Sequence, residues 1–286
     1  MKIFEANIFN IYGESGKAWL LQLPKLVEKI SIKWNLSDLK PVENLSYNYI
    51  LSGFQDKQPI ILKISPDIEG LSREAAALTS FFGYGAVRIS AQTSDALLLH
   101  QVVPGNSLKS YFPDKDKEAI QITCKVMKKL HQAPLPEKGM FPHINEWLSL
   151  IDNYSQCTKA QILKDRLLKT AATPVLLHGD LHHDNILQNI NGWLVIDPKG
   201  VIGESAYEVA SFIRNPLHLF QLQGDQLYNL IQNRITDFAS ILDLDARRIQ
   251  DWCFVQAALS WVWALEDGND PKHFVSLLEL FEKIHK

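Results

Sequence analysis

The sequence predicts an α+β protein with two lobes, a small β-rich lobe over residues 1–103 and a larger, mainly helical lobe over residues 104–286. The apolar runs before residue 104 are mostly short and rich in β-branched or aromatic residues, which is typical of strands. Those after it mostly repeat at intervals of three and four residues, which is typical of amphipathic helices. With 286 residues and 46% hydrophobic content, the chain is long enough to bury a substantial core.

The elements of the first lobe follow in order along the chain. A helix is expected over residues 18–34, with a kink or restart at Pro24. Residues 45–65 predict a β-hairpin with a polar turn near residues 55–58. An alanine-rich helix over 71–83 follows, and two further strand-like runs within residues 86–103 complete the lobe.

The second lobe begins at Pro104-Gly105, which we expect to act as a hinge. Amphipathic helices are predicted over residues 116–133 and 144–151. Two short apolar runs, 174–177 and 193–196, interrupt this helical pattern, and charged residues follow each of them. From Tyr207 onward the pattern is helical to the end of the chain.

Composition excludes several classes of protein. The formal net charge is −3 and basic residues form no run longer than a pair, so no nucleic-acid partner is expected. The longest apolar stretch, residues 254–265, is shorter than the roughly 20 residues needed to cross a bilayer, so no membrane partner is expected. Three widely spaced cysteines indicate neither a disulfide framework nor a zinc site. We therefore expect a soluble cytoplasmic protein.

The stretch "VLLHGDLHHDNILQNINGWLVIDPKG", residues 175–200, gathers polar side chains around two apolar runs. Phosphoryl transfer needs a carboxylate that orients or deprotonates the attacking hydroxyl, together with oxygen ligands for Mg²⁺. Asp180, Asn185 and Asp197 supply such atoms. The pattern H-x-D-x-x-x-x-N at a strand end, followed by a short strand that ends in Asp, indicates a kinase-like catalytic loop and magnesium loop.

Three alternative interpretations of this stretch remain open. A metal-dependent phosphohydrolase would use His178, His182 and His183 as ligands, although Gly179 argues against the helix that would align the first two. A loop whose histidines only hydrogen-bond the backbone would leave Asp197 unexplained. A catalytically inactive, kinase-like nucleotide-binding module would be expected to lack some of the catalytic positions that this chain retains.

The motifs "HGDLHHDN" and "VIDPKG" resemble those of the aminoglycoside phosphotransferase family of small-molecule kinases. The segments "GESAYEVASFIRNP" and "WLLQLP" are most similar to its streptomycin kinase and hydroxyurea phosphotransferase branch, and the resemblance extends from about residue 18 to residue 268. It implies a two-lobed protein-kinase-like fold, with ATP or GTP as phosphate donor and Mg²⁺ as the metal ion. It also implies that Asp180 is the base and that Asn185 and Asp197 hold the Mg²⁺.

The resemblance implies further roles in the first lobe. Lys63 would bind phosphate, with Glu74 as its partner on the following helix. Gln101 and Val103 belong to a segment that would lie against the adenine. No G-x-G-x-x-G precedes Lys63, so Ser46 and its neighbours would cover the phosphates instead.

Two further expectations concern the catalytic loop and its surroundings. Glu208 occupies the position of an aspartate that braces the loop in the family, and its longer side chain could still reach the loop. His178 is expected to hydrogen-bond the loop backbone, whereas His182 and His183 are expected to face elsewhere.

The acceptor is expected to be a small molecule. Only eleven positions lead from Asp197 to Glu208, which is too short for a peptide-docking segment. Near the C-terminus, Trp263, Glu266 and Asp267 could hold a polycationic, sugar-like substrate through stacking and charge-assisted hydrogen bonds. A buried helix followed by an acidic turn would give the same pattern. The sequence thus predicts a kinase that phosphorylates a hydroxyl of an aminoglycoside such as streptomycin.

Overall fold

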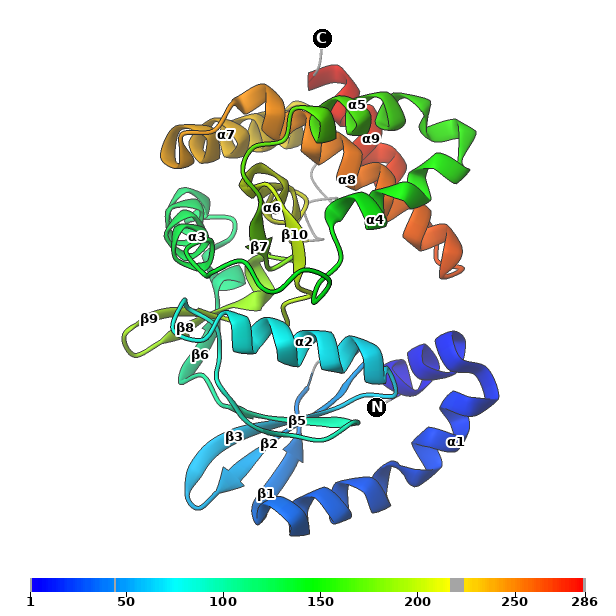
Figure 1. Cartoon of the computed structure of the whole chain (residues 1–286), viewed down its shortest axis with the longest axis vertical. Coiled ribbons are helices and arrows are strands. Elements are labelled where there is room, and N and C mark those ends of the chain that lie inside the picture. The colour runs from blue at the N-terminus through cyan, green and yellow to red at the C-terminus, as the bar shows by residue number, and fades with distance from the viewer. Residues whose placement is uncertain (1, 44, 217–223, 285–286) are drawn as a thin grey trace. The chain divides into compact units, whose positions relative to one another are not determined.

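The structure is a computed structural model that describes residues 2–43, 45–216 and 224–284. It contains two compact units (Figure 1). The first comprises residues 1–82 and 87–103, and the second comprises residues 83–86 and 104–286. The first unit contains an antiparallel sheet with two helices, and the second is mainly helical, so the predicted α+β class is confirmed.

The first unit is built on a five-stranded antiparallel sheet of order β1-β2-β3-β5-β4. The predicted hairpin is formed by β2 and β3, and Asp56 and Lys57 at its turn both have positive φ, as a tight hairpin turn requires. Helix α2 (Ile68–Ser80) begins at Asp67, whose Oδ1 accepts the N–H of Gly70 at 2.8 Å. The strands are β1 (Leu36–Pro41), β2 (Tyr49–Gln55), β3 (Gln58–Ile64), β4 (Ile89–Gln92) and β5 (Ala96–His100).

The N-terminal helix differs from the prediction. Helix α1 spans Lys2–Trp34, and its break lies at Gly13, with φ 56° and ψ −134°, whereas Pro24 stays inside the helix. Glycine reaches this conformation without the steric penalty that a Cβ imposes. The first arm is short, and its formation depends on burying Phe4 and Ile8 in the core that α1 shares with the sheet.

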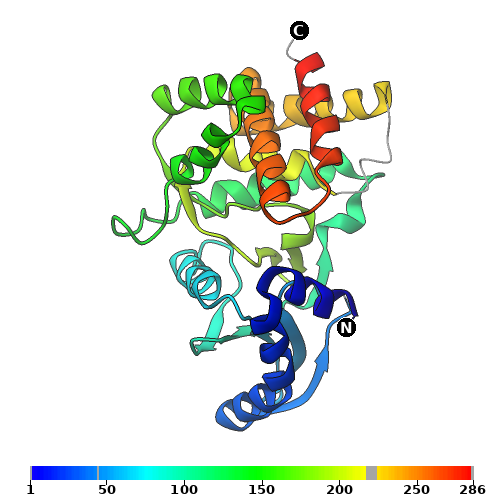
Figure 2. The same cartoon turned by 90° about the vertical axis from the view of Figure 1, so that its right-hand side faces the viewer.

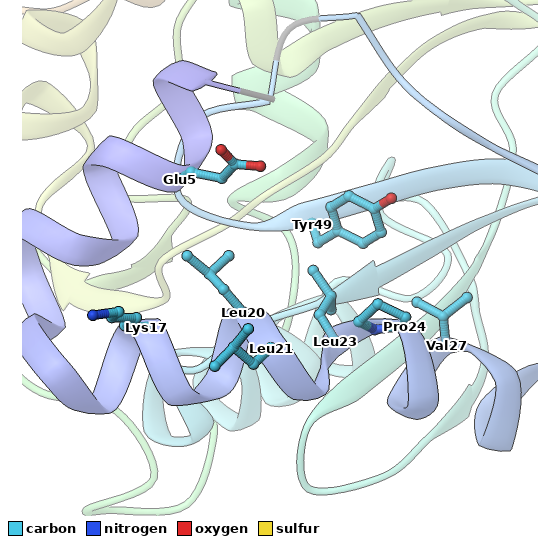
Figure 3. Close-up of a pocket in the computed structure, with 8 residues that line it drawn as sticks. All are labelled: Glu5, Lys17, Leu20, Leu21, Leu23, Pro24, Val27 and Tyr49. Carbon is cyan, nitrogen blue, oxygen red and sulfur yellow. The ribbon is translucent and has the colours of Figure 1, made fainter.

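A groove of about 620 Å³ lies between the two arms of α1 and strand β2 (Figure 3). Its walls are mainly leucine side chains of the second arm and the ring of Tyr49, and Glu5 and Lys17 also line it. Burial raises the pKa of the Tyr49 hydroxyl. The groove thus follows from the bend at Gly13, which folds the first arm back over the second.

Strand β1 was not predicted from the sequence. Its residues, LSDLKP, include no β-branched side chain and end in a proline, both of which disfavour a strand. Pairing with β2, from Leu36 opposite Gln55 to Pro41 opposite Leu51, forms it nonetheless, with an irregular register between Ser37 and Lys40. The β1 strand therefore depends on its neighbour and not on local propensity.

In the second unit, helix α8 lies at the centre of the packing and contacts α5, α6, α7 and α9 (Figures 1 and 2). It is almost entirely buried over its first fifteen residues, 246–260, apart from the turn at its start. The helices are α3 (Asp116–Leu130), α4 (Ile144–Leu148), α5 (Thr158–Lys169), α6 (Ser205–Ile213), α7 (Asp225–Leu242), α8 (Ala246–Glu266) and α9 (Lys272–Ile284).

Two small sheets complete the second unit. Strand β7 (Val175–Leu177) pairs with β10 (Val201–Gly203), and β8 (Ile186–Asn189) pairs with both β6 (Pro104–Ser107) and β9 (Gly192–Val195). Strand β8 was not predicted. Pro104-Gly105, which was predicted to be a hinge between the lobes, begins both strand β6 and the main segment of the second unit, and Pro104 pairs with Asn189 across the sheet.

The predicted helix over residues 144–151 is also shorter than expected. It begins with a capping box, in which Asn145 N–H binds the His143 ring and Glu146 accepts the His143 N–H. It ends at Leu148 and continues as a tighter 3₁₀ turn, Ser149–Asn153. Within residues 2–43, 45–216 and 224–284, no helix combines the length and apolar character that a membrane crossing requires.

Candidate active site

The loop after strand β7 carries Asp180 and is shaped by Gly179. Gly179 has φ +84°, a conformation that side chains other than glycine rarely adopt. A Cβ at this position would lie 3.0 Å from Cη2 of Trp147 and 3.3 Å from Cβ of Lys199. Gly179 therefore allows both the turn and the close approach of these neighbours.

His178 ties the loop to the next strand. Its side chain is fully buried, its Nε2 lies 2.9 Å from the carbonyl oxygen of Ile196, and its Nδ1 accepts the N–H of Asp180 at 3.3 Å. Burial lowers the pKa of His178, outweighing the nearby carboxylate of Glu208. A neutral ring that donates from Nε2 satisfies both contacts, so His178 hydrogen-bonds the loop backbone as predicted.

The carboxylate of Asp180 lies between two nitrogen-bearing side chains. Its Oδ2 is 3.6 Å from Nε2 of His182, and its Oδ1 is 3.7 Å from Nη2 of Arg214. Burial disfavours the charged form, but the nearby His182 ring and the charges of Arg214 and Lys199 hold the pKa of Asp180 well below its usual range. Asp180 is therefore ionised at neutral pH.

The prediction that His182 and His183 both face elsewhere is wrong for His182. Besides its contact with Asp180, His182 places Nε2 3.3 Å from Nδ2 of Asn185, and its Nδ1 accepts the N–H of Asp184. His183 is fully buried and stacks on Phe212 at 3.8 Å. Two adjacent residues in a short turn have no periodicity from which the sequence alone could assign these opposite directions.

The three histidines therefore do not converge on one point. His178 faces the Ile196 carbonyl, His182 faces Asp180, and His183 packs in the core. Among the residues that the structure describes, no group of three or more His, Cys, Asp or Glu side chains is arranged to hold a metal ion. These positions give no support to a histidine-ligated phosphohydrolase centre.

Asn185 and Asp197 follow on neighbouring turns. Nδ2 of Asn185 donates to the carbonyl oxygen of Asp180 at 3.0 Å, which turns the amide nitrogen toward the loop. The N–H of Ile196 donates to the carbonyl oxygen of Asn185 at 3.1 Å, so the two turns are joined. Asp197 has φ +57°, and its Oδ2 accepts from Nζ of Lys199 at 3.1 Å. An amide oxygen and a carboxylate are donors of the kind that Mg²⁺ prefers, so these residues fit the ion that the family resemblance implies.

Glu208 of α6 holds the backbone of the loop. Its Oε2 accepts the N–H of His178 at 2.7 Å and its Oε1 accepts the N–H of Gly179 at 2.9 Å. The Glu208 side chain is fully buried, and Nε2 of His131 lies 3.5 Å from Oε2. The longer glutamate side chain thus reaches both amides, which resolves the question that the sequence raised.

The first unit contains the residues expected to bind nucleotide. Nζ of Lys63, on β3, lies 2.5 Å from Oε2 of Glu74, on α2, and both side chains are buried. Ser46 is exposed in the loop between β1 and β2, and its carbonyl oxygen accepts from Nδ2 of Asn7. Gln101 and Val103 follow β5, with the N–H of Gln101 donating to the carbonyl of Pro59 and Val103 43% exposed.

The residues expected to bind the acceptor lie at the end of α8. Trp263 is half-buried, whereas Glu266 and Asp267 are exposed. Sequence reasoning assigned Trp147 only to an amphipathic helix, yet its ring forms an edge-to-face pair with Trp263, with centroids 6.0 Å apart. It also gave no role to Arg214, although this arginine lies within the distinctive segment "GESAYEVASFIRNP".

The sequence profile of the aminoglycoside/hydroxyurea antibiotic resistance kinases matches residues 33–268. The chain belongs to this family. The resemblance recognised in the motifs is thereby confirmed, and so is the prediction of a phosphotransferase of the aminoglycoside kinase type.

Two characterised relatives illustrate the match in sequence. The chain is 29% identical to a streptomycin 3''-kinase from Klebsiella pneumoniae over 77% of this chain and 85% of that protein. It is 24% identical to a streptomycin 6-kinase from Streptomyces glaucescens over 92% and 90% of the two chains.

The fold matches that of a thermostable mutant of the aminoglycoside phosphotransferase APH(4)-Ia, solved in a ternary complex with AMP-PNP and hygromycin B. The TM-score is 0.67 at 16% identity, covering 90% of this chain and 97% of the other. The predicted two-lobed, kinase-like fold is confirmed.

Proposed function

We propose that the protein transfers the γ-phosphoryl group of ATP to a hydroxyl of an aminoglycoside, with streptomycin as the first acceptor to test. In this reaction a bond forms between the acceptor oxygen and the γ-phosphorus, and the bond from that phosphorus to the β–γ bridging oxygen breaks. The acceptor proton passes to a carboxylate, and ADP leaves. The relatives named as streptomycin kinases support this acceptor class.

Asp180 is the proposed catalytic carboxylate. The ionised form, favoured by His182 and Arg214, can accept a hydrogen bond from the acceptor hydroxyl and so aim its oxygen at phosphorus. A carboxylate with a depressed pKa is a weak base, but a loose transition state requires little deprotonation before the new bond forms. Asp180 therefore orients the hydroxyl first and takes its proton late.

Asn185 and Asp197 are the proposed ligands of Mg²⁺. An ion held by these residues would supply positive charge that offsets the negative charge developing on the transferred phosphoryl group. The protein contributes an amide whose nitrogen is held by the Asp180 carbonyl, together with a carboxylate paired with Lys199. These contacts fix the orientation of both side chains before the nucleotide arrives.

Lys63 is proposed to bind the nucleotide phosphates, positioned by its buried ion pair with Glu74. Ser46 and its neighbours would cover the phosphates, and the backbone near Gln101 and Val103 would contact the adenine. GTP is the alternative donor, to be distinguished by competition. The cytoplasm, where ATP is abundant, is the proposed site of the reaction.

Trp263, Glu266 and Asp267 are proposed to bind the acceptor. An ammonium or guanidinium group can interact with an indole face and form charge-assisted hydrogen bonds with carboxylates. The two exposed carboxylates follow Trp263 by three and four residues, so all three share one face of α8.

The observation that carries this proposal is the ionised Asp180 on a backbone held by Glu208. The test is incubation of the purified protein with ATP, Mg²⁺ and streptomycin, followed by mass spectrometry. We expect a product heavier than streptomycin by one phosphoryl group, together with stoichiometric ADP. ATP hydrolysis to ADP and phosphate, with streptomycin and a panel of other aminoglycosides all unmodified, would refute the proposal.

A further inference from the structure

Two tryptophans form an aromatic pair in the second unit. Trp147 comes from α4 and Trp263 from α8, and these helices lie side by side in both views (Figures 1 and 2). The ring planes meet at 72° with the centroids 6.0 Å apart. Both side chains are only half-buried, so each indole retains a surface that a ligand can cover.

Trp147 also contacts the catalytic loop. The position that a Cβ would take on Gly179 lies 3.0 Å from Cη2 of Trp147, so the indole packs directly on the glycine backbone. Gly179 is the residue that immediately precedes Asp180. One edge of the tryptophan pair therefore lies against the loop that carries the proposed catalytic carboxylate.

The face of α8 that carries Trp263 leads to the same loop. At its buried end, Gln256 accepts a hydrogen bond from Nη1 of Arg214 at 2.5 Å, and Nη2 of this arginine lies 3.7 Å from Asp180. Spacings of four, three and four residues place side chains on one face of a helix. The residues of α8 with this spacing are Gln256, Ser260 and Trp263, and Asp267, which caps the end of the helix, continues it.

We propose that Trp147, together with Trp263, forms the wall on which the acceptor ring lies, so that Trp147 is a specificity-determining residue. The ligand class is a cationic amino sugar or aminocyclitol, whose rigid ring can pack on an indole and whose charged nitrogen can lie over it. This inference rests on the proposed function. Trp147 contributes to acceptor binding in the ground state and the transition state alike, so its loss raises KM and leaves kcat largely unchanged.

A second aromatic pair on the same helix provides a matched control. Trp261 is also half-buried and forms an edge-to-face pair with Tyr154, with centroids 5.6 Å apart. It precedes Trp263 by two residues, which turns it about 200° around the helix axis. Trp261 therefore has a similar packing role, but it lies on a different face of α8 from Trp263.

The test compares steady-state kinetics of Trp147→Leu, Trp147→Phe and Trp261→Leu. The acceptor is the compound that wild-type protein phosphorylates best among streptomycin and other aminoglycosides, with ATP as donor. For Trp147→Leu we expect the acceptor KM to rise about tenfold, which corresponds to about 1.4 kcal/mol of lost binding. The KM for ATP and kcat should stay within about threefold of wild type, as expected for a loss of uniform acceptor binding.

The other two variants separate binding from folding. Trp147→Phe keeps an aromatic face and should restore most of the acceptor affinity, whereas Trp261→Leu should leave the acceptor KM unchanged. Thermal unfolding of all three variants identifies any that are misfolded. If Trp147→Leu is misfolded, Trp147→Phe is compared with wild type at non-saturating acceptor: its smaller ring should raise the acceptor KM slightly, and an unchanged acceptor KM would overturn the inference. Equal acceptor KM values for wild type and Trp147→Leu would overturn the inference, as would equal increases for Trp147→Leu and Trp261→Leu.

The failure of this inference is distinguishable from that of the proposed function. If wild-type protein phosphorylates none of the compounds, the proposed function fails and this inference falls with it. If wild-type protein is active while Trp147→Leu is kinetically normal, only the assignment of Trp147 is overturned.

Discussion

The loop that carries Asp180 and the end of helix α8 that carries Glu266 differ in how firmly each is held. The loop is fixed by buried groups, with both carboxylate oxygens of Glu208 on its amides and His178 joining it to Ile196. Glu266 and Asp267 are exposed side chains at a helix end. The difference indicates that the chemistry depends on a preorganised backbone, whereas the exposed carboxylates at the end of α8 can change without disturbing the loop.

The largest effect is expected at the proposed metal ligands. Asp197→Ala removes a carboxylate that the proposal assigns to Mg²⁺, so magnesium-dependent turnover should be abolished while the fold is retained. Product formation at increasing Mg²⁺ concentration measures this, with circular dichroism as the check on folding. Lys199→Ala is the control, because it removes the partner of Asp197 and keeps the carboxylate. Near wild-type turnover in Asp197→Ala would contradict the assignment.

Loss of the brace should be the next largest effect. Glu208→Ala leaves two buried amides, those of His178 and Gly179, without their acceptor, at a cost of about 1–3 kcal/mol each. We expect the free energy of unfolding to fall and kcat to fall with it, measured by denaturant unfolding and by steady-state turnover. Glu208→Asp keeps the negative charge but has a shorter side chain, so its free energy of unfolding and its kcat should lie between those of wild type and Glu208→Ala. A fully active and stable Glu208→Ala protein would show that the loop needs no brace.

Arg214 tests the electrostatics of the loop. Its cation favours the ionised form of Asp180, so Arg214→Gln should raise the pKa of Asp180. The carboxylate must be ionised to accept a hydrogen bond from the hydroxyl of the substrate. The acid limb of the plot of kcat against pH should therefore move to higher pH. Arg214→Lys keeps the positive charge, so its acid limb should lie closer to that of wild type than the acid limb of Arg214→Gln does. Superimposable profiles for wild type and Arg214→Gln would rule out this influence.

The smallest effects are expected at the exposed end of α8. Glu266→Gln and Asp267→Asn each remove one solvent-exposed charge, worth about 0.2–1 kcal/mol, so the acceptor KM should rise by only about 1.4- to fivefold. Added salt should reduce the difference from wild type, because it screens exposed charges. An acceptor KM that is unchanged at low ionic strength in the double variant would remove both carboxylates from the acceptor site.

Much of the fold could be predicted because periodic patterns record burial. The hairpin of β2 and β3 and the helix α3 have clear two-residue and helical repeats. The first arm of α1 and strand β1 were missed because their stability comes from partners distant in sequence, such as the burial of Phe4 against the sheet. Local propensity does not contain that information.

The site was predictable only where a motif fixes the order of residues. The pattern around Asp180 pointed to a catalytic loop, and family membership supports the kinase interpretation. The direction of the His182 ring and the packing of Trp147 on Gly179 depend on turn geometry and on tertiary contacts, which spacing along the chain does not reveal. Helical periodicity assigned Trp147 to a buried face and so concealed its partial exposure.

The most direct test of the central claim is the turnover number of Asp180→Asn. The variant keeps the size of the side chain and removes its charge, and a catalytic carboxylate of this kind is typically worth about 10²–10⁴-fold in rate. We predict a fall in kcat of at least about a hundredfold, with ATP affinity unchanged, because the loss falls on the transition state and not on nucleotide binding. A kcat within a few fold of wild type would contradict the account.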